Sequence, residues 1–142
     1  MSTLIFQPVI ALMALTFIVW CYMYFLRLNY VIANNIPTRK LETPEQYHSV
    51  LPTAVNKPSN NLKNLFEMPI LFYALCALSL SINAIDMFLI YLAWAFVVMR
   101  GIHSLLHCFS ENVTARFFAY FVSSMILWIM VAKFCYTAVM LN

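Results

Sequence analysis

Seven polar side chains that could do chemistry interrupt the apolar segments of this chain. They are one carboxylate, two guanidiniums, two imidazoles, an amide and a phenol, carried by Asn64, Glu67, Arg100, His103, His107, Arg116 and Tyr120. A charge near the centre of a bilayer costs about 2.5–3.5 kcal/mol on insertion scales. Charged residues inside hydrophobic segments therefore indicate a functional site by default.

The composition around these residues is that of a membrane protein. The chain has 142 residues, of which 64% are hydrophobic and 9% are charged, whereas soluble domains carry about 25% charged residues. The length predicts a single domain over residues 1–142. The net charge of +3 is too small to suggest a nucleic-acid partner, and we expect none.

Four long apolar segments are the elements that must position the polar residues. Each can form a helix long enough to cross a hydrocarbon core of about 30 Å. The sequence therefore predicts an all-α integral membrane protein, built as a four-transmembrane-helix bundle. The predicted helices cover residues 4–26, 64–82, 86–108 and 114–141.

The distribution of Lys and Arg predicts the orientation of the bundle. Five of the eight cationic residues lie in the long connection over residues 27–63, and none lies in the connection around 83–86. The positive-inside rule therefore places the long loop in the cytoplasm and both termini outside. Within this loop, Thr43 and Gln46 form a capping-box pattern around Pro44, which predicts a short surface helix near residues 44–50.

This topology predicts that the seven polar residues meet. Asn64 and Glu67 open the second predicted helix, the three residues from Arg100 to His107 lie near the end of the third, and the last two open the fourth. All seven would thus occupy the cytoplasmic third of the membrane. Within each helix their spacings are i, i+3, i+4 or i+7, which place them on one stripe.

Several simpler interpretations of these residues stay open at this point. Glu67 and Arg100 could form a buried ion pair that fixes helix register, because intramembrane charges pair in this way. The two histidines could have no role beyond hydrogen bonds to the backbone or to water. Arg116 could anchor the chain to lipid phosphate, and Tyr120 could belong to an interfacial aromatic belt.

A zinc site is the first chemical alternative for the cluster. His103, His107 and Glu67 supply two imidazoles and a carboxylate, a combination known from catalytic zinc sites. Two neighbouring guanidiniums would repel a divalent cation, so we expect no metal.

An anion site fits the residue types better. With Glu67 neutralising one guanidinium, one unpaired cation remains beside neutral donors, and Lys57 and Lys63 would add positive potential at the mouth. A small polyanion could arrive from the cytoplasm while an apolar co-substrate or lipid arrives from the bilayer. An Arg beside a bound thiol would also favour the nucleophilic thiolate.

Two segments and two single residues resemble a known family. Asn64-Leu65-Phe66-Glu67-Met68-Pro69, followed by Ile70-Leu71-Phe72-Tyr73, is similar to the second-helix signature of the MAPEG family, the membrane-associated proteins of eicosanoid and glutathione metabolism. Arg100-Gly101-Ile102-His103-Ser104 resembles its third-helix motif. Arg116 lies where members place the arginine that faces the glutathione thiol, and Tyr120 matches the tyrosine that follows.

The resemblance implies a homotrimer that holds glutathione as a co-substrate between subunits, near the cytoplasmic face. It implies a glutathione-dependent transferase or peroxidase that acts on a lipophilic electrophile. Arg116 would stabilise the thiolate and Tyr120 would help to line the site, so we predict these two as catalytic. The predicted glutathione-binding residues are Asn64, Glu67, Arg100, His103 and His107.

At three positions the chain departs from the family pattern, and these departures indicate which branch of the family it resembles. Asn60 stands where a basic residue can grip glutathione, His107 replaces a phenol, and Phe117 replaces a small polar residue. The pattern of His103, Ser104 and His107 is closer to the short bacterial branch, which implies a bacterial inner membrane. The alternative function is a non-catalytic membrane component that binds a lipid headgroup or a partner membrane protein.

Overall fold

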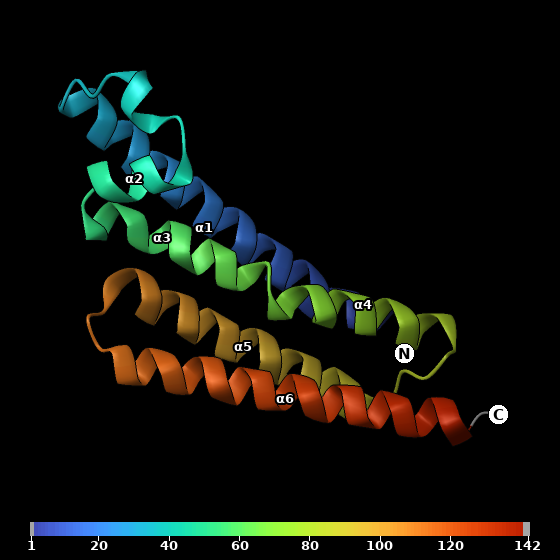
Figure 1. The fold of residues 1–142 in the computed structure, drawn as a ribbon. Helices are drawn as coiled ribbons and strands as arrows, with labels where there is room; N and C mark the ends of the chain where they lie inside the picture. Colours follow the sequence, from blue (N-terminus) through green and yellow to red (C-terminus); the bar gives the residue numbers. More distant parts are fainter. Residues whose placement is uncertain (1, 141–142) are drawn as a thin grey trace.

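The computed structural model describes residues 2–140, and helices are its only regular elements within that range. Figure 1 shows long helices running side by side, with shorter ones gathered around α2. In chain order the elements are η1 (Ser2–Ile5), α1 (Phe6–Ala33), η2 (Thr38–Leu41), α2 (Pro44–Val50), α3 (Thr53–Leu65), α4 (Met68–Ser81), α5 (Met87–Phe109) and α6 (Val113–Met140).

Four helical spans in the described residues are long and apolar enough to cross a membrane. Large apolar side chains lie exposed on the outside of the bundle, for example Phe17, Phe25 and Phe118. This combination confirms the prediction of an all-α, multi-pass integral membrane protein. The spans are Thr3–Ala33, Thr53–Ser81, Met87–Phe109 and Val113–Met140.

Helix α5 is the centre of the bundle. It packs along most of α6 and also contacts α1 and α3, while α4 packs on α6. The helices α5 and α6 begin and end within one residue of their predicted bounds. We call the end of the bundle that carries α2 the loop end; α1 begins and α6 finishes at the opposite end (Figure 1).

The long connection is shorter than predicted because the helices on both sides extend into it. The prediction that the first helix ends at residue 26 is wrong: α1 continues to Ala33, since Arg27 and the residues after it are compatible with a helix. It stops in a Schellman motif, with Asn35 at φ 48° and the Ile36 N–H donating to the Val31 carbonyl at 3.1 Å. Asn supplies the left-handed residue where Gly is more usual.

The second span is broken, and this corrects the prediction of one helix over residues 64–82. The helix α3 begins at Thr53 and ends at Leu65, and α4 begins at Met68. Pro69 has no N–H for the Leu65 carbonyl and its ring would clash there, which interrupts the helix. Glu67 takes φ −92° and ψ −94° at the break, so Asn64 and Glu67 do not share a helical stripe.

The short helix predicted near residues 44–50 is confirmed as α2. The Gln46 N–H donates to Thr43 Oγ1 at 3.4 Å, and the Thr43 N–H donates to Gln46 Oε1 at 3.2 Å. This is the complete capping box that the sequence predicts. The Arg27 guanidinium lies 4.9 Å from the centroid of the Tyr47 ring, which ties α2 to the end of α1.

Asp86 fixes the end of the bundle opposite α2. Its carboxylate accepts a hydrogen bond from the Leu89 N–H at 2.8 Å as the N-cap of α5, and another from Lys133 Nζ at 2.6 Å. Burial would raise the pKa of Asp86, but the hydrogen bonds from Lys133 and Leu89, with the attraction of the Lys133 charge, lower it further than burial raises it. The capped, paired form is therefore the ionised one.

We expect Asp86→Ala to lower the free energy of unfolding by about 1 kcal/mol, the usual effect of losing an N-cap. The contribution of the ionised carboxylate is complete above its unfolded pKa and is lost as the pH falls through the lower folded value. Chemical unfolding in detergent micelles at about pH 7 and about pH 3 should therefore show a smaller difference at the lower pH. Asp86→Asn, which keeps a capping oxygen, should lose less than Asp86→Ala.

Candidate functional site

Five of the seven predicted site residues line one cavity of about 290 Å³. The cavity lies between α3, α5 and α6, toward the loop end of the bundle. Polar side chains from all three helices meet there, together with Val113 and Phe117 of α6. The five predicted residues that line it are Asn64, His103, His107, Arg116 and Tyr120.

His103 joins the three helices at the centre of this cavity. Its Nδ1 lies 3.0 Å from the backbone carbonyl oxygen of Arg116, and its Nε2 lies 3.3 Å from Asn64 Nδ2. A carbonyl oxygen only accepts hydrogen bonds, so Nδ1 must carry the proton and donate it. Nε2 is then the acceptor for the Asn64 amide, which defines His103 as a neutral imidazole with both nitrogens engaged.

His107 provides an unused polar atom beside His103. The two rings meet edge to face, with centroids 5.6 Å apart. The residue is buried, and its Nδ1 has no hydrogen-bond partner. Buried polar atoms are rarely left unpaired, so this nitrogen is available to a bound ligand.

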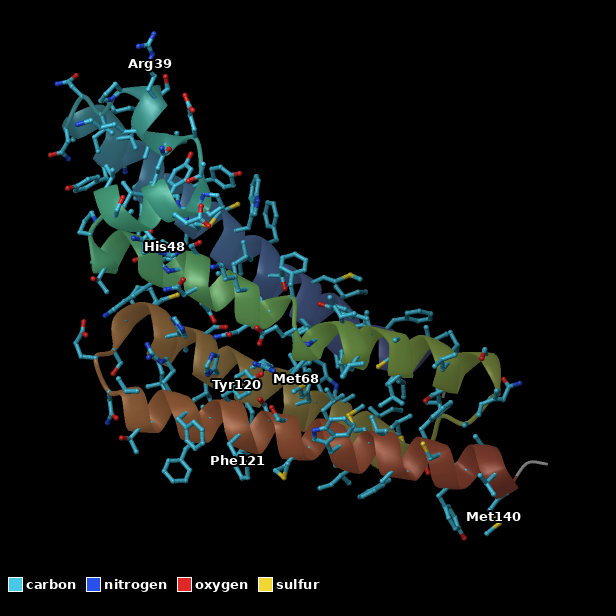
Figure 2. The ribbon with its side chains drawn as sticks, in the orientation of Figure 1. Arg39, His48, Met68, Tyr120, Phe121 and Met140 are labelled. Atoms are coloured by element: carbon cyan, nitrogen blue, oxygen red, sulfur yellow. The ribbon has the colours of Figure 1, made fainter. Side chains whose placement is uncertain are left out.

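Tyr120 connects the cavity to the break in the second span. Its hydroxyl donates to Glu67 Oε2 at 3.3 Å, and its ring lies edge to face with His103 at 5.5 Å. Figure 2 shows Tyr120 on the side of α6 that faces the start of α4 at Met68, whereas Phe121 lies on the outer side. The break thus brings Glu67 to the site through Tyr120.

Arg100 lies fully buried beneath the cavity and lacks any hydrogen bond. Its exposed fraction is 0%, and Nε, Nη1 and Nη2 are all without partners. The guanidinium lies 4.7 Å from the centroid of the Tyr120 ring and 5.5 Å from that of Phe96. Cation–π contact offsets part of the desolvation cost but supplies no acceptor for the N–H groups.

The ion pair that Glu67 and Arg100 could form is not present among the described residues. Among residues 2–140 the ion pairs join Lys57 to Glu111 and Lys133 to Asp86. The break places Glu67 on an exposed turn, where its carboxylate accepts from Tyr120. The interpretation of Glu67 and Arg100 as a pair that fixes register is therefore wrong for this arrangement.

Arg116 brings an unpaired positive charge to the cavity wall. The residue is half-buried, and within the described part of the chain it belongs to neither ion pair. The positive potential expected from the two lysines at the mouth is smaller than predicted. Lys57 is paired with Glu111, and Lys63 lines a separate polar cavity of about 410 Å³ with Arg27 and Tyr47.

A buried polar contact beside the cavity was not predicted from the sequence. Asn61 of α3 donates to Cys108 Sγ at 3.6 Å and accepts from Ser104 Oγ at 3.3 Å. Its i−3 spacing from Asn64 was a usable signal, but the second helix was predicted to begin only at Asn64. The described residues contain no group of three or more His, Cys, Asp or Glu arranged to hold a metal ion.

The fold and the site define a class: an integral membrane protein with four helical spans and a cationic polar site within the bundle. The chain matches the MAPEG family model over residues 5–136, and it belongs to this family. It is thus a membrane protein of the family of eicosanoid and glutathione metabolism. No curated protein and no solved structure matches the chain.

Proposed function

We propose that the protein is a glutathione-dependent transferase or peroxidase that acts on a lipophilic electrophile. The observation that carries the proposal is a pair of guanidiniums that have no ion-pair partner among residues 2–140, Arg100 buried and Arg116 on the cavity wall. Among the described residues, Glu67 is the carboxylate that reaches the site, through the Tyr120 hydroxyl, so the site keeps an excess of positive charge. Glutathione is an anion with two carboxylates and a thiol, and family membership supports its choice over other anions.

Four residues of the site have roles in this proposal. Arg116 stabilises the thiolate, which attacks the electrophile while the leaving group departs with its bonding electrons. His107 Nδ1 offers an unpaired ring nitrogen to the ligand, and Arg100, buried behind the Tyr120 ring, adds positive charge and unpaired donors. The Tyr120 hydroxyl donates a hydrogen bond to Glu67, so that proton is not available to the substrate. The role of Tyr120 in this proposal is to orient the neighbouring side chains of the site.

The size of the cavity supports assembly of several copies. Its volume of about 290 Å³ lies at the lower limit for a small-molecule site. A tripeptide and an electrophile would overfill it, and a neighbouring protomer would supply further walls for them. We propose that this assembly is a homotrimer. From the resemblance and the distribution of Lys and Arg, we also propose that the protein belongs to the short bacterial branch. It would lie in the inner membrane, with the loop end in the cytoplasm and both termini outside.

The first test of the proposal is binding. We expect glutathione to stabilise the purified protein saturably against thermal unfolding, by about 2.7 kcal/mol at a concentration 100 times its Kd. The measurement is a thermal shift in detergent, repeated with an electrophile to detect the thioether product. Absence of both the shift and the product would contradict the proposal. A shift caused only by vesicles or micelles that contain anionic lipid would favour the non-catalytic alternative.

A further inference from the structure

A polar stripe on α3 joins this helix to the α5–α6 hairpin along the side of the cavity. Its members, Lys57, Asn61 and Asn64, have spacings i, i+4 and i+7, so they lie on one face. Asn64 contacts His103, and Asn61 contacts Ser104 and Cys108. We call these contacts, with those of Lys57, the polar seam.

Lys57 makes the last contact of the seam, nearest the loop end. Its Nζ donates to the backbone carbonyl of Ser110 at 3.4 Å and pairs with the Glu111 carboxylate. The partners differ in exposure: the side chain of Lys57 is 13% exposed and that of Glu111 is 91% exposed. The Lys57 hydrogen bond and charge hold the pKa of Glu111 below its usual range.

The turn that Lys57 holds leads directly into the cavity wall. Ser110 Oγ accepts from the Asn112 N–H at 3.0 Å, and Asn112 Oδ1 accepts from the Ala115 N–H at 2.9 Å. The Arg116 N–H in turn donates to the Asn112 carbonyl at 3.2 Å. Val113, in the first turn of α6, already lines the cavity. A displacement of the turn would therefore move the wall that carries Arg116.

The two kinds of contact in the seam have different physical properties. Asn61 is fully buried and neutral, so its bonds hold α3 and α5 together regardless of salt. The Lys57–Glu111 pair has one partner in water, where mobile ions screen the attraction and the pair breaks readily. The buried Asn61 amide can thus keep the register while the ion pair opens and closes.

We propose that Lys57 and Glu111 form an ionic latch at the turn that leads into the cavity wall, and that its opening controls the access of an anionic ligand to Arg116. Lys57 acts as a positioning residue. This inference rests on the proposed function for the identity of the ligand. It adds a kinetic element: the latch governs how fast the ligand enters and leaves, with little effect on how tightly it binds.

The kinetic test compares Glu111→Gln with the unchanged protein in stopped-flow binding of glutathione at low ionic strength. We expect the association and dissociation rate constants both to rise about fivefold, an effect of the size expected for an exposed ion pair, while Kd changes less than twofold. The difference should disappear at about 1 M salt, where the Debye length is about 3 Å. Glu45→Gln removes the same charge from the exposed α2, and its rate constants should not change.

Two results would overturn the latch as a control of access. The first is an association rate constant that rises, and a Kd that falls in proportion, to the same extent in Glu111→Gln and Glu45→Gln. This result would indicate only that removing a negative charge strengthens the long-range attraction of anionic glutathione. Unchanged rate constants with a lower melting temperature would indicate a purely structural pair.

A second measurement needs no ligand. Hydrogen–deuterium exchange of residues 110–116 should accelerate about fivefold in Glu111→Gln, while exchange in the middle of α5 stays unchanged. Equal exchange in both proteins would overturn the latch. If glutathione fails to bind but exchange accelerates as expected, the latch stands and the proposed function fails.

Discussion

Arg116→Ala should reduce glutathione conjugation by about 10²–10³-fold while the protein keeps its fold, the range found when one oriented donor to a developing anion is removed. The guanidinium is the half-buried cation on the cavity wall and has no ion-pair partner among the described residues. Without it, the bound thiol would lose the charge that favours the thiolate. Ultraviolet difference absorbance of bound glutathione should therefore show less thiolate at neutral pH.

The matched control for this variant is Arg39→Ala, which removes an exposed arginine from η2, outside the cavity. It should leave both the conjugation rate and the thiolate signal unchanged. Only the side chain is lost in Arg116→Ala, so the backbone carbonyl that accepts from His103 is retained. An active Arg116→Ala enzyme with an unchanged thiolate signal would remove Arg116 from the mechanism.

Arg100→Met should make the empty protein more stable and at the same time unable to respond to glutathione. The guanidinium is fully buried and none of its nitrogens has a partner, which costs folding free energy. An apolar side chain of similar length removes that cost, and we expect a gain of about 1–3 kcal/mol in the free energy of unfolding. The measurement is unfolding in detergent with and without glutathione.

These opposite effects on stability and on binding distinguish two explanations of why the Arg100 guanidinium is buried without a partner. If its partner is a ligand anion, stability rises and the glutathione-induced shift disappears. If the variant instead loses stability and keeps the shift, the guanidinium has a structural partner in the assembled protein. Arg27→Met is the control, because Arg27 is a half-buried arginine that stacks on Tyr47 outside the cavity.

The gathering of polar residues near one end of the bundle could be predicted from the sequence. The lengths of the apolar segments predicted the spans, and the i, i+3, i+4 and i+7 spacings predicted which helix faces carry the polar residues. The helices α5 and α6 are regular and end at clear polar boundaries, and their predicted bounds were accurate. His103, His107, Arg116 and Tyr120 on these helices line the cavity.

The second span shows what the pattern could not reveal. A polar amphipathic helix followed by an apolar helix has the same hydrophobicity pattern as a loop followed by a single span. The pattern therefore places most of α3 in the connection. Pro69 within an apolar run did not show whether the helix would bend or stop. The prediction that Glu67 meets Arg100 failed for this reason, because the turn before Pro69 directs the Glu67 carboxylate to Tyr120.

The broken second span also leaves a short apolar helix on one side of the bundle. At about 1.5 Å per residue the 14 residues of α4 rise only about 21 Å, less than a hydrocarbon core of about 30 Å. Helix α3 must therefore complete the crossing and carry its polar residues below the level of the headgroups. Polar residues at that depth favour local thinning of the bilayer. We expect the bilayer to be thinnest beside α3, which would shorten the path of a water-soluble molecule to the cavity that Arg116 lines.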